Sequence, residues 1–190
     1  MSGVLGGLLA SYAAKGTAFE SIASATGTGS SGTITFSSIP STYTSLQIRA
    51  IVKETATASA YESDILIRFN GDTGSNYAYH YLRGNGTSVT AAGFATQTSG
   101  AVIDILTSSN ATIANMQGVG IIDIHNYAST TQNKTMRAFA GADLNGSGGI
   151  ALSSSLWTST SAITSISLIN ANGSNFTTTT TFALYGIKGA

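Results

Sequence analysis

Acidic side chains and histidines are the residues of this chain whose types could support catalysis. The acidic residues number 8, and only Glu62 and Asp64 stand close together, on one face of an expected strand. Two carboxylates flanking a sugar linkage are the machinery of a glycosidase, but such a pair also needs a cleft and sugar-stacking aromatic rings. A solvated strand edge or an intersubunit salt bridge is the simpler interpretation of this pair.

Metal binding is the second chemistry that the residue types suggest. His80 and His125 lie in strand patterns, and Asp123 shares a strand face with His125, a combination that could ligate a transition metal. Asn70 and Asp72 alternate in the loop FNGDTGS as in a calcium-binding turn, but one carboxylate is too few for a good site. The sequence contains no nucleophile elbow, phosphate-binding loop or zinc-protease helix. We therefore predict no catalytic residue, no metal, no cofactor and no enzymatic activity.

Aromatic side chains offer a third kind of site, a contact surface. Tyr77, Tyr79 and Tyr81 alternate along one expected strand and therefore share one of its faces. A tyrosine ring has an apolar body and a polar tip, so such a row suits either the core between two sheets or a surface that meets a partner. We predict that these tyrosines form an intersubunit face. If the protein instead binds a glycan, the expected contacts are Tyr43, Tyr61 and Trp157.

The composition predicts an all-β protein. Only 8% of the 190 residues are charged, against roughly 25% in an average soluble domain, and 27 Ser and 27 Thr supply the polar surface instead. Threonine favours strands, whereas Ser and the 22 glycines favour turns. The net charge of zero excludes the basic footprint of a nucleic-acid binder and suits a protein that works within an assembly. There is no cysteine, so disulfides and thiolate metal sites are excluded.

A succession of short strands, separated by Gly, Ser and Asn turns, is expected to carry these residues. Strands with turn signals between them predict a two-sheet antiparallel β-sandwich or jelly roll over residues 17–190. Residues 45–54 show the expected alternation, with Leu46, Ile48, Ala50 and Val52 on the buried face. Outside the central hairpin described next, the expected strands are 19–26, 33–36, 45–54, 87–93, 101–106, 116–127, 134–141, 150–158, 163–170 and 178–188.

Residues 64–83 are expected to form a β-hairpin at the centre of the fold. Period-two patterns flank the turn, in which Asn70-Gly71 and Thr73-Gly74 can supply positive φ angles.

The N-terminal residues 1–16 are expected to form a docking arm rather than part of the sandwich. They are small, apolar and uncharged until Lys15, and their glycines weaken any helix. The segment lacks the basic region of a signal peptide, and its apolar run is too short to cross a membrane. The arm either tucks against its own domain or docks onto a partner. The residues expected to contact that partner are Val4, Leu5, Leu8, Leu9 and Tyr12.

Three stretches carry a resemblance to a known group of proteins. FSSIPSTYTSLQIRAIVK (36–53), IRFNGDTGSNYAYHYLRGNG (67–86) and FALYGIKGA (182–190) are similar to segments of small bacteriophage virion proteins, and the FNGDTGSNY run is the most specific of them. The resemblance covers most of the chain from about residue 33 onward. Members resemble the β-sandwich domains of capsid decoration (cement) proteins and of tail fibre or tailspike tips.

The resemblance implies a homotrimeric sandwich on a virion surface, without enzymatic activity and without catalytic residues to carry over. The favoured expectation is a cement protein that binds the major capsid protein on the outer surface of the shell and neither binds nucleic acid nor inserts into a membrane. The alternative is a tail-tip module that recognises host surface glycans.

Overall fold

The structure is a computed structural model that describes residues 18–56, 63–107 and 115–189. These residues form β-strands joined by turns and loops, which confirms the all-β fold class. The strands are β1 (Phe19–Thr26), β2 (Thr33–Phe36), β3 (Ser45–Val52), β4 (Ser63–Phe69), β5 (Tyr77–Gly84), β6 (Val89–Gln97), β7 (Ala101–Thr107), β8 (Gly118–His125), β9 (Lys134–Asp143), β10 (Gly148–Trp157), β11 (Ile166–Asn170) and β12 (Thr181–Ile187).

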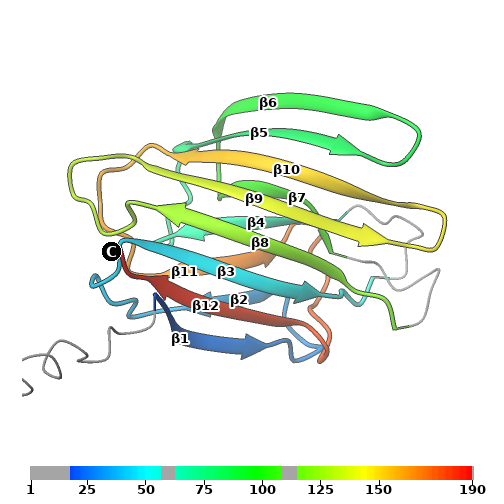
Figure 1. The fold of residues 1–190 in the computed structure, drawn as a ribbon, viewed down its shortest axis with the longest axis horizontal. Coiled ribbons are helices and arrows are strands. Elements are labelled where there is room, and N and C mark those ends of the chain that lie inside the picture. The colour runs from blue at the N-terminus through cyan, green and yellow to red at the C-terminus, as the bar shows by residue number, and fades with distance from the viewer. Residues whose placement is uncertain (1–17, 57–62, 108–114, 190) are drawn as a thin grey trace, which may run out of the picture.

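The strands make two antiparallel sheets of unequal size. The larger sheet has eight strands in the order β1-β12-β3-β8-β9-β10-β5-β6, and the smaller has four in the order β2-β11-β4-β7. In Figure 1 the larger sheet lies in front of the smaller one, and β5 and β6 extend past it at the top. The expected two-sheet sandwich is confirmed, whereas the finer expectation of a jelly roll stays a prediction.

The core lies between the two sheets and is built from the inward side chains of alternating strands. In β3, Leu46, Ile48, Ala50 and Val52 are buried as the alternation predicts, and Ile65 and Ile67 of β4 are buried opposite them in the smaller sheet. Complete burial of each such aliphatic side chain stabilises the fold by roughly 1.5–3 kcal/mol. The core therefore fixes which side of each strand faces outward.

The expected hairpin at residues 64–83 is wrong. β4 pairs with β7 and β11 in the smaller sheet, whereas β5 pairs with β10 and β6 in the larger one. The connection between them therefore crosses from one sheet to the other. Asn70 and Gly71 do have positive φ angles, 51° and 69°. Period-two patterning predicts that both segments are strands, but it carries no information about which strand pairs with which.

Hydrogen bonds hold this crossover to the neighbouring strand ends. Asp72 Oδ2 accepts the indole N–H of Trp157 at 2.7 Å and the side-chain amide of Asn76 at 2.9 Å. The Tyr77 hydroxyl accepts from the backbone N–H of Phe69 at 3.1 Å and donates to the carbonyl of Asp72 at 3.2 Å. The FNGDTGSNY run is thus a structural junction, and its single carboxylate is used within the fold.

Candidate functional site

The outer face of the larger sheet carries most of the exposed apolar surface of the described residues. Ten large hydrophobic side chains of this part of the chain are exposed, and nine of them lie on this one face. Phe19 of β1 stands apart beside Arg49, and the other eight form one group across six strands. Because side chains alternate along a strand, these residues have the opposite parity to the core. We call this group the apolar face; it comprises Ile51, Leu82, Val89, Val119, Ile121, Phe139, Ile150 and Leu152.

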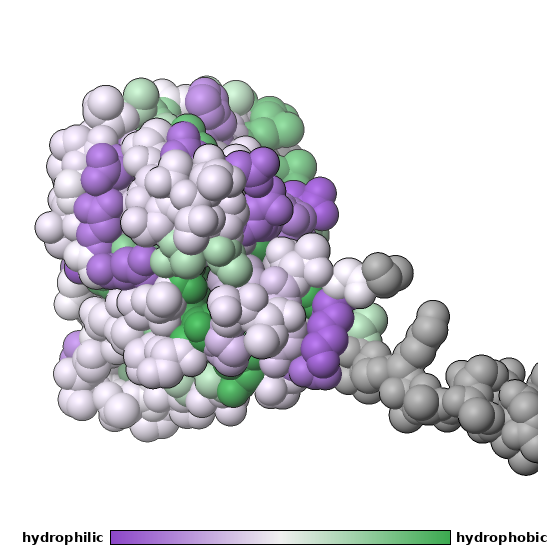
Figure 2. Space-filling model, turned by 90° about the vertical axis from the view of Figure 1, so that its left-hand side faces the viewer, coloured by the Kyte–Doolittle hydropathy of each residue, from purple (hydrophilic) through white to green (hydrophobic). Residues whose placement is uncertain are grey.

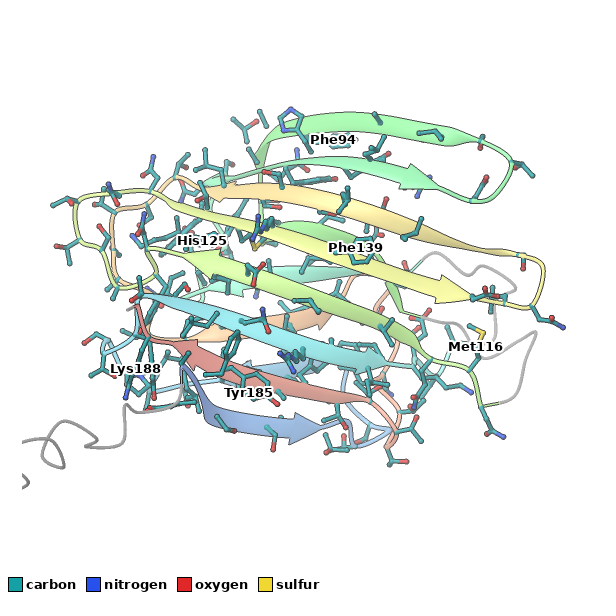
Figure 3. All side chains as sticks on the ribbon, in the orientation of Figure 1. Phe94, Met116, His125, Phe139, Tyr185 and Lys188 are labelled. Carbon is teal, nitrogen blue, oxygen red and sulfur yellow. The ribbon has the colours of Figure 1, made fainter. Side chains whose placement is uncertain are left out.

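The strand register arranges the apolar face in two adjacent rows that cross the sheet. Directly paired residues of antiparallel strands point to the same side. The first row runs Ile51–Val119–Gly141–Ile150–Gly84–Val89, from β3 through β8, β9, β10 and β5 to β6. The second row, one step along the strands, runs Arg49–Ile121–Phe139–Leu152–Leu82–Ala91. Phe139 is near the centre of the sheet in Figure 3 and is 51% exposed.

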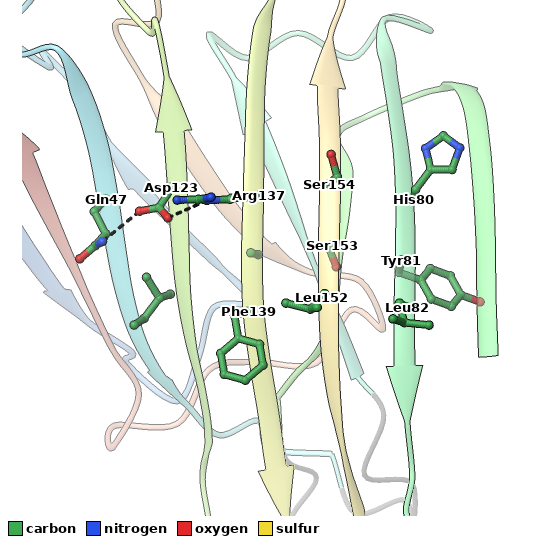
Figure 4. A pocket seen from close by; sticks show the side chains of 12 residues that line it. Gln47, His80, Tyr81, Leu82, Asp123, Arg137, Phe139, Leu152, Ser153 and Ser154 are labelled. Atoms are coloured by element: carbon green, nitrogen blue, oxygen red, sulfur yellow. Dashed lines mark hydrogen bonds and ion pairs between the residues drawn. The ribbon is translucent and has the colours of Figure 1, made fainter. Parts of the chain in front are cut away.

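A polar row borders the apolar face on one side. In the next step of the register, Gln47, Asp123, Arg137, Ser154 and His80 follow one another across the sheet. Asp123 accepts from Gln47 Nε2 at 2.9 Å and from Arg137 Nε at 3.2 Å, as the dashed lines in Figure 4 show. The charges at this border are therefore paired with each other rather than available to a distant partner.

Arg49 is the charged residue within the second row, and aromatic rings accommodate it. Its guanidinium lies 5.8 Å from the ring centroid of Phe19 and 5.3 Å from that of Tyr185, and its Nε donates to Gln47 at 3.0 Å. A guanidinium stacked on aromatic rings is stabilised without a carboxylate. Arg49 therefore interrupts the apolar rows less than an isolated charge would.

The face is shallowly hollowed where the apolar and polar rows meet. A hollow of about 710 Å³ is lined by residues of both, including Leu152, Phe139 and Leu82 on the apolar side and Asp123 and Arg137 on the polar side (Figure 4). A second hollow, of about 600 Å³, lies between Ile51, Val119 and Ile150. Both are open depressions of a sheet surface, into which apolar side chains of another protein could pack.

The whole outer side of the larger sheet, which includes the apolar face and the polar row, has the dimensions of a protein interface. Eight strands about 4.8 Å apart, each of about eight residues rising 3.4 Å, present roughly 1,000 Å². A stable interface buries about 800 Å² on each partner, with an apolar centre and a polar rim. The end of the sandwich seen in Figure 2 is mostly pale, with a few purple patches and some green.

The predicted tyrosine row is divided between the core and the surface. Tyr77 is buried, and its ring packs 6.4 Å from both Phe69 and Trp157 (centroid to centroid), so the prediction that it lies at an intersubunit face is wrong. Tyr79 and Tyr81 are half-buried on the same side of β5 and stack on Phe94 at 4.9 Å and 6.4 Å. Their intersubunit role stays a prediction.

The residues expected to bind a glycan do not form a common platform. Trp157 is only 3% exposed, because its indole N–H is hydrogen-bonded to Asp72 and its ring is packed by Phe69, so its predicted role as an exposed sugar contact is wrong. Tyr43 is half-buried; its ring covers Gly186, where an added Cβ would lie 2.4 Å from it, and its hydroxyl donates to Glu20 at 3.2 Å. Tyr61 lies outside the described residues.

The other sequence candidates are separated or lie outside the described residues. His80 on β5 and Asp123 on β8 have β9 and β10 between them, which places them roughly 14 Å apart across the sheet. The described residues contain no group of three His, Cys, Asp or Glu side chains placed to hold a metal ion. Glu62, the partner of Asp64 in the carboxylate pair, is outside the described residues, as is the whole docking arm with Val4, Leu5, Leu8, Leu9 and Tyr12.

Sequence reasoning missed the apolar face, although the signal was present. Strand β8 carries large apolar residues at both parities, such as Ile121 beside Ile122, and β10 has Ile150 and Leu152 at one parity and Trp157 at the other. A strand that is apolar on both sides is typical of a sheet covered on both faces. In the described residues the smaller sheet covers only the inner face, so the second apolar parity is left uncovered.

Comparison with family models, curated proteins and solved structures gave no match for this chain. The described residues include no helix with the length and apolar character that crossing a membrane requires. Function therefore has to be inferred from the sequence and from the surface described above.

Proposed function

We propose that the protein is a bacteriophage virion structural protein, a homotrimeric capsid decoration protein whose apolar face packs against other copies of the same chain. The observation that carries the proposal is the apolar face itself. A protein that folds in solution and must later find a capsid cannot leave such a surface in water without aggregating. Burial by its own copies at the time of folding removes that hazard, and interfaces of this apolar character are typical of obligate homo-oligomers.

A three-fold arrangement suits a broad sheet face. Around a three-fold axis, each protomer presents one part of the face to one neighbour and another part to the second, so the ring closes. The polar row of Gln47, Asp123 and Arg137 then forms the rim. The nearly uncharged chain and its net charge of zero allow three copies to approach without electrostatic repulsion.

The trimer would stabilise the shell by mass action. A protein that binds assembled capsid but not dissociated subunits shifts the equilibrium toward the assembled shell. The predicted capsid contacts are the apolar residues of the N-terminal arm, and the major capsid protein is the proposed partner. The tail-tip alternative is less well supported, because Trp157, one of its expected sugar contacts, is buried.

The face can be tested by adding charge to it. We expect the double variant Phe139→Lys, Leu152→Lys to fold but to be monomeric, because both side chains are about half exposed within the protomer. At low concentration, analytical ultracentrifugation should give three chain masses for the wild type and one for the variant, and the variant should no longer co-sediment with capsids. The matched control, Thr135→Lys with His125→Lys, adds the same charge to the same sheet face outside the apolar rows and should remain trimeric. A monomeric wild type, or a trimeric double variant, would contradict the proposal.

A further inference from the structure

The edge strand β6 (Val89–Gln97) leaves one side of its backbone without a strand partner among the described residues. It forms the end of the larger sheet and pairs only with β5. In Figure 1 it lies at the top of the molecule, beyond the smaller sheet. An edge strand of this kind presents a row of N–H and C=O groups to which another extended strand can bind.

The register shows which backbone groups point outward. Asn85 and Ser88 close the β5–β6 hairpin, with the Asn85 N–H donating to the Ser88 carbonyl at 3.2 Å. Hydrogen-bonded and non-hydrogen-bonded pairs alternate from there along an antiparallel ladder. Thr90, Ala92 and Phe94, which lie opposite Arg83, Tyr81 and Tyr79, therefore form the hydrogen bonds to β5. The N–H and C=O groups of Val89, Ala91 and Gly93 point to the open edge.

The other edge strands of the two sheets carry features that discourage strand addition, and β6 has few of them. β1 has a bulge between Ser21 and Ala23 and an ion pair at Glu20, and β2 is only four residues long. β7 carries the inward-pointing Asp104. β6 contains no charged residue and no proline, and it is regular from Val89 to Phe94, ending at a bulge where Thr96 has φ 53°.

The outward-pointing segment of β6 is also complementary to itself. In an antiparallel pair centred on Ala91, Val89 of one copy faces the partner's Gly93. Gly93 has no side chain, and the His80 ring occupies the space beside it: a Cβ added to Gly93 would lie 2.3 Å from that ring. Three facing residue pairs of the hydrogen-bonded type would supply about six backbone hydrogen bonds. No charge opposes the approach, since neither copy contributes one.

We propose that β6 pairs antiparallel with β6 of a second copy of this chain across a two-fold axis centred on Ala91. The pair continues the larger sheet from one protomer into the next, and it also covers the neighbourhood of Val89, which is 74% exposed and lies at the end of the first apolar row. A two-fold contact cannot close a ring of three. It therefore joins protomers of two trimers, and in this respect the inference rests on the proposed function.

The test removes the outward N–H without removing a hydrogen bond to β5. Proline is tolerated in an edge strand where its nitrogen faces solvent, so Ala91→Pro should fold, which circular dichroism will check. Losing the two central hydrogen bonds, at about 0.5–1.5 kcal/mol each, should raise the dissociation constant of the pair about tenfold or more. Ala91→Ser keeps the N–H and is the matched control. Thr90→Lys, at an exposed position on the side of β6 opposite the apolar rows, places two like charges beside the axis and is the second test if the proline variant does not fold.

Sedimentation velocity of the full chain over a range of concentrations separates the outcomes. We expect the wild type and Ala91→Ser to pass from three to six chains as concentration rises, with Ala91→Pro and Thr90→Lys remaining at three. A wild type that never exceeds three chains, or an Ala91→Pro variant that associates like the wild type, overturns the inference. If the wild type forms two chains and Ala91→Pro one, the β6 pair is upheld and the three-fold arrangement of the proposed function fails.

Discussion

At the scale of single residues, Asp72 shows how this fold uses one of its few charges. Its Oδ2 accepts from Trp157 and Asn76, and its Oδ1 accepts from the Gly74 N–H at 2.8 Å. The Trp157 indole N–H is the main cause that lowers the pKa of the Asp72 carboxyl; burial opposes it, and the Asn76 and Gly74 donors add to it. The carboxylate thus fixes the end of β10 against the sheet crossover.

The Asp72 interactions predict a dependence of stability on pH. A carboxyl whose pKa is lower in the folded state contributes stability that is present above its unfolded pKa, about 4, and is lost as the pH falls below that value. In Asp72→Asn an amide N–H₂ would face other donors, so we expect a loss of about 1 kcal/mol at pH 6–7. Urea unfolding at a series of pH values should show that the difference in unfolding free energy between wild type and variant becomes smaller in acid.

The control for Asp72 is Ser75→Ala, a change without a titratable group in the same exposed loop. The difference in unfolding free energy between Ser75→Ala and the wild type should not change with pH. If the loss of unfolding free energy in Asp72→Asn stays constant down to strongly acid pH, the role assigned to the carboxylate is contradicted.

At the scale of elements, the crossover after β4 depends on Asn70. Its side-chain oxygen accepts from the backbone N–H groups of Thr164 at 2.8 Å and Ser165 at 3.1 Å, and its amide donates to Ala162 at 2.8 Å. Asn70 also has φ 51°, a conformation that favours Asn and Gly. One residue therefore both turns the chain and ties it to the segment that leads into β11.

We expect Asn70→Ala to destabilise the protein by about 1–2 kcal/mol, through lost hydrogen bonds and a strained backbone. Asn70→Asp keeps both the acceptor and the tolerance of positive φ, and should cost less. Asn70→Gly relieves the strain alone and should fall between the two. Chemical denaturation of the three variants measures this order; a cost for Asn70→Ala no greater than that for Asn70→Asp would refute it.

Element by element, the sequence predicted strand positions well and strand partners poorly. Alternation located β1 (Phe19–Thr26) and β2 (Thr33–Phe36) to the residue and identified the buried face of β3. It could not distinguish a hairpin from a crossover at Asn70, because pairing is decided by contacts between distant segments such as β4 and β11. Contacts between distant segments also decide the candidate site. Trp157 was expected to be an exposed sugar contact, but it is buried and hydrogen-bonded to Asp72, 85 positions away, which the sequence pattern could not reveal.

At the scale of the whole molecule, the unequal sheets explain where the protein can make contacts. Four strands cannot cover both faces of eight, so the outer side of the larger sheet is uncovered among the described residues, and we propose that other copies of the chain cover it. The rows that carry Phe139, Leu152 and Ile121 became visible only when the register of six strands was known. The sequence contributed one part of this proposal: its low content of charged residues suits a protein that works within an assembly.

The most direct test of the proposed capsid role is the copy number of the protein per virion, measured by quantitative mass spectrometry of purified particles. The proposal predicts hundreds of copies, in a fixed ratio to the major capsid protein, because a decoration layer follows the shell lattice. A few to a few tens of copies would move the protein to the tail and contradict the capsid role, and its absence from particles would contradict virion membership altogether.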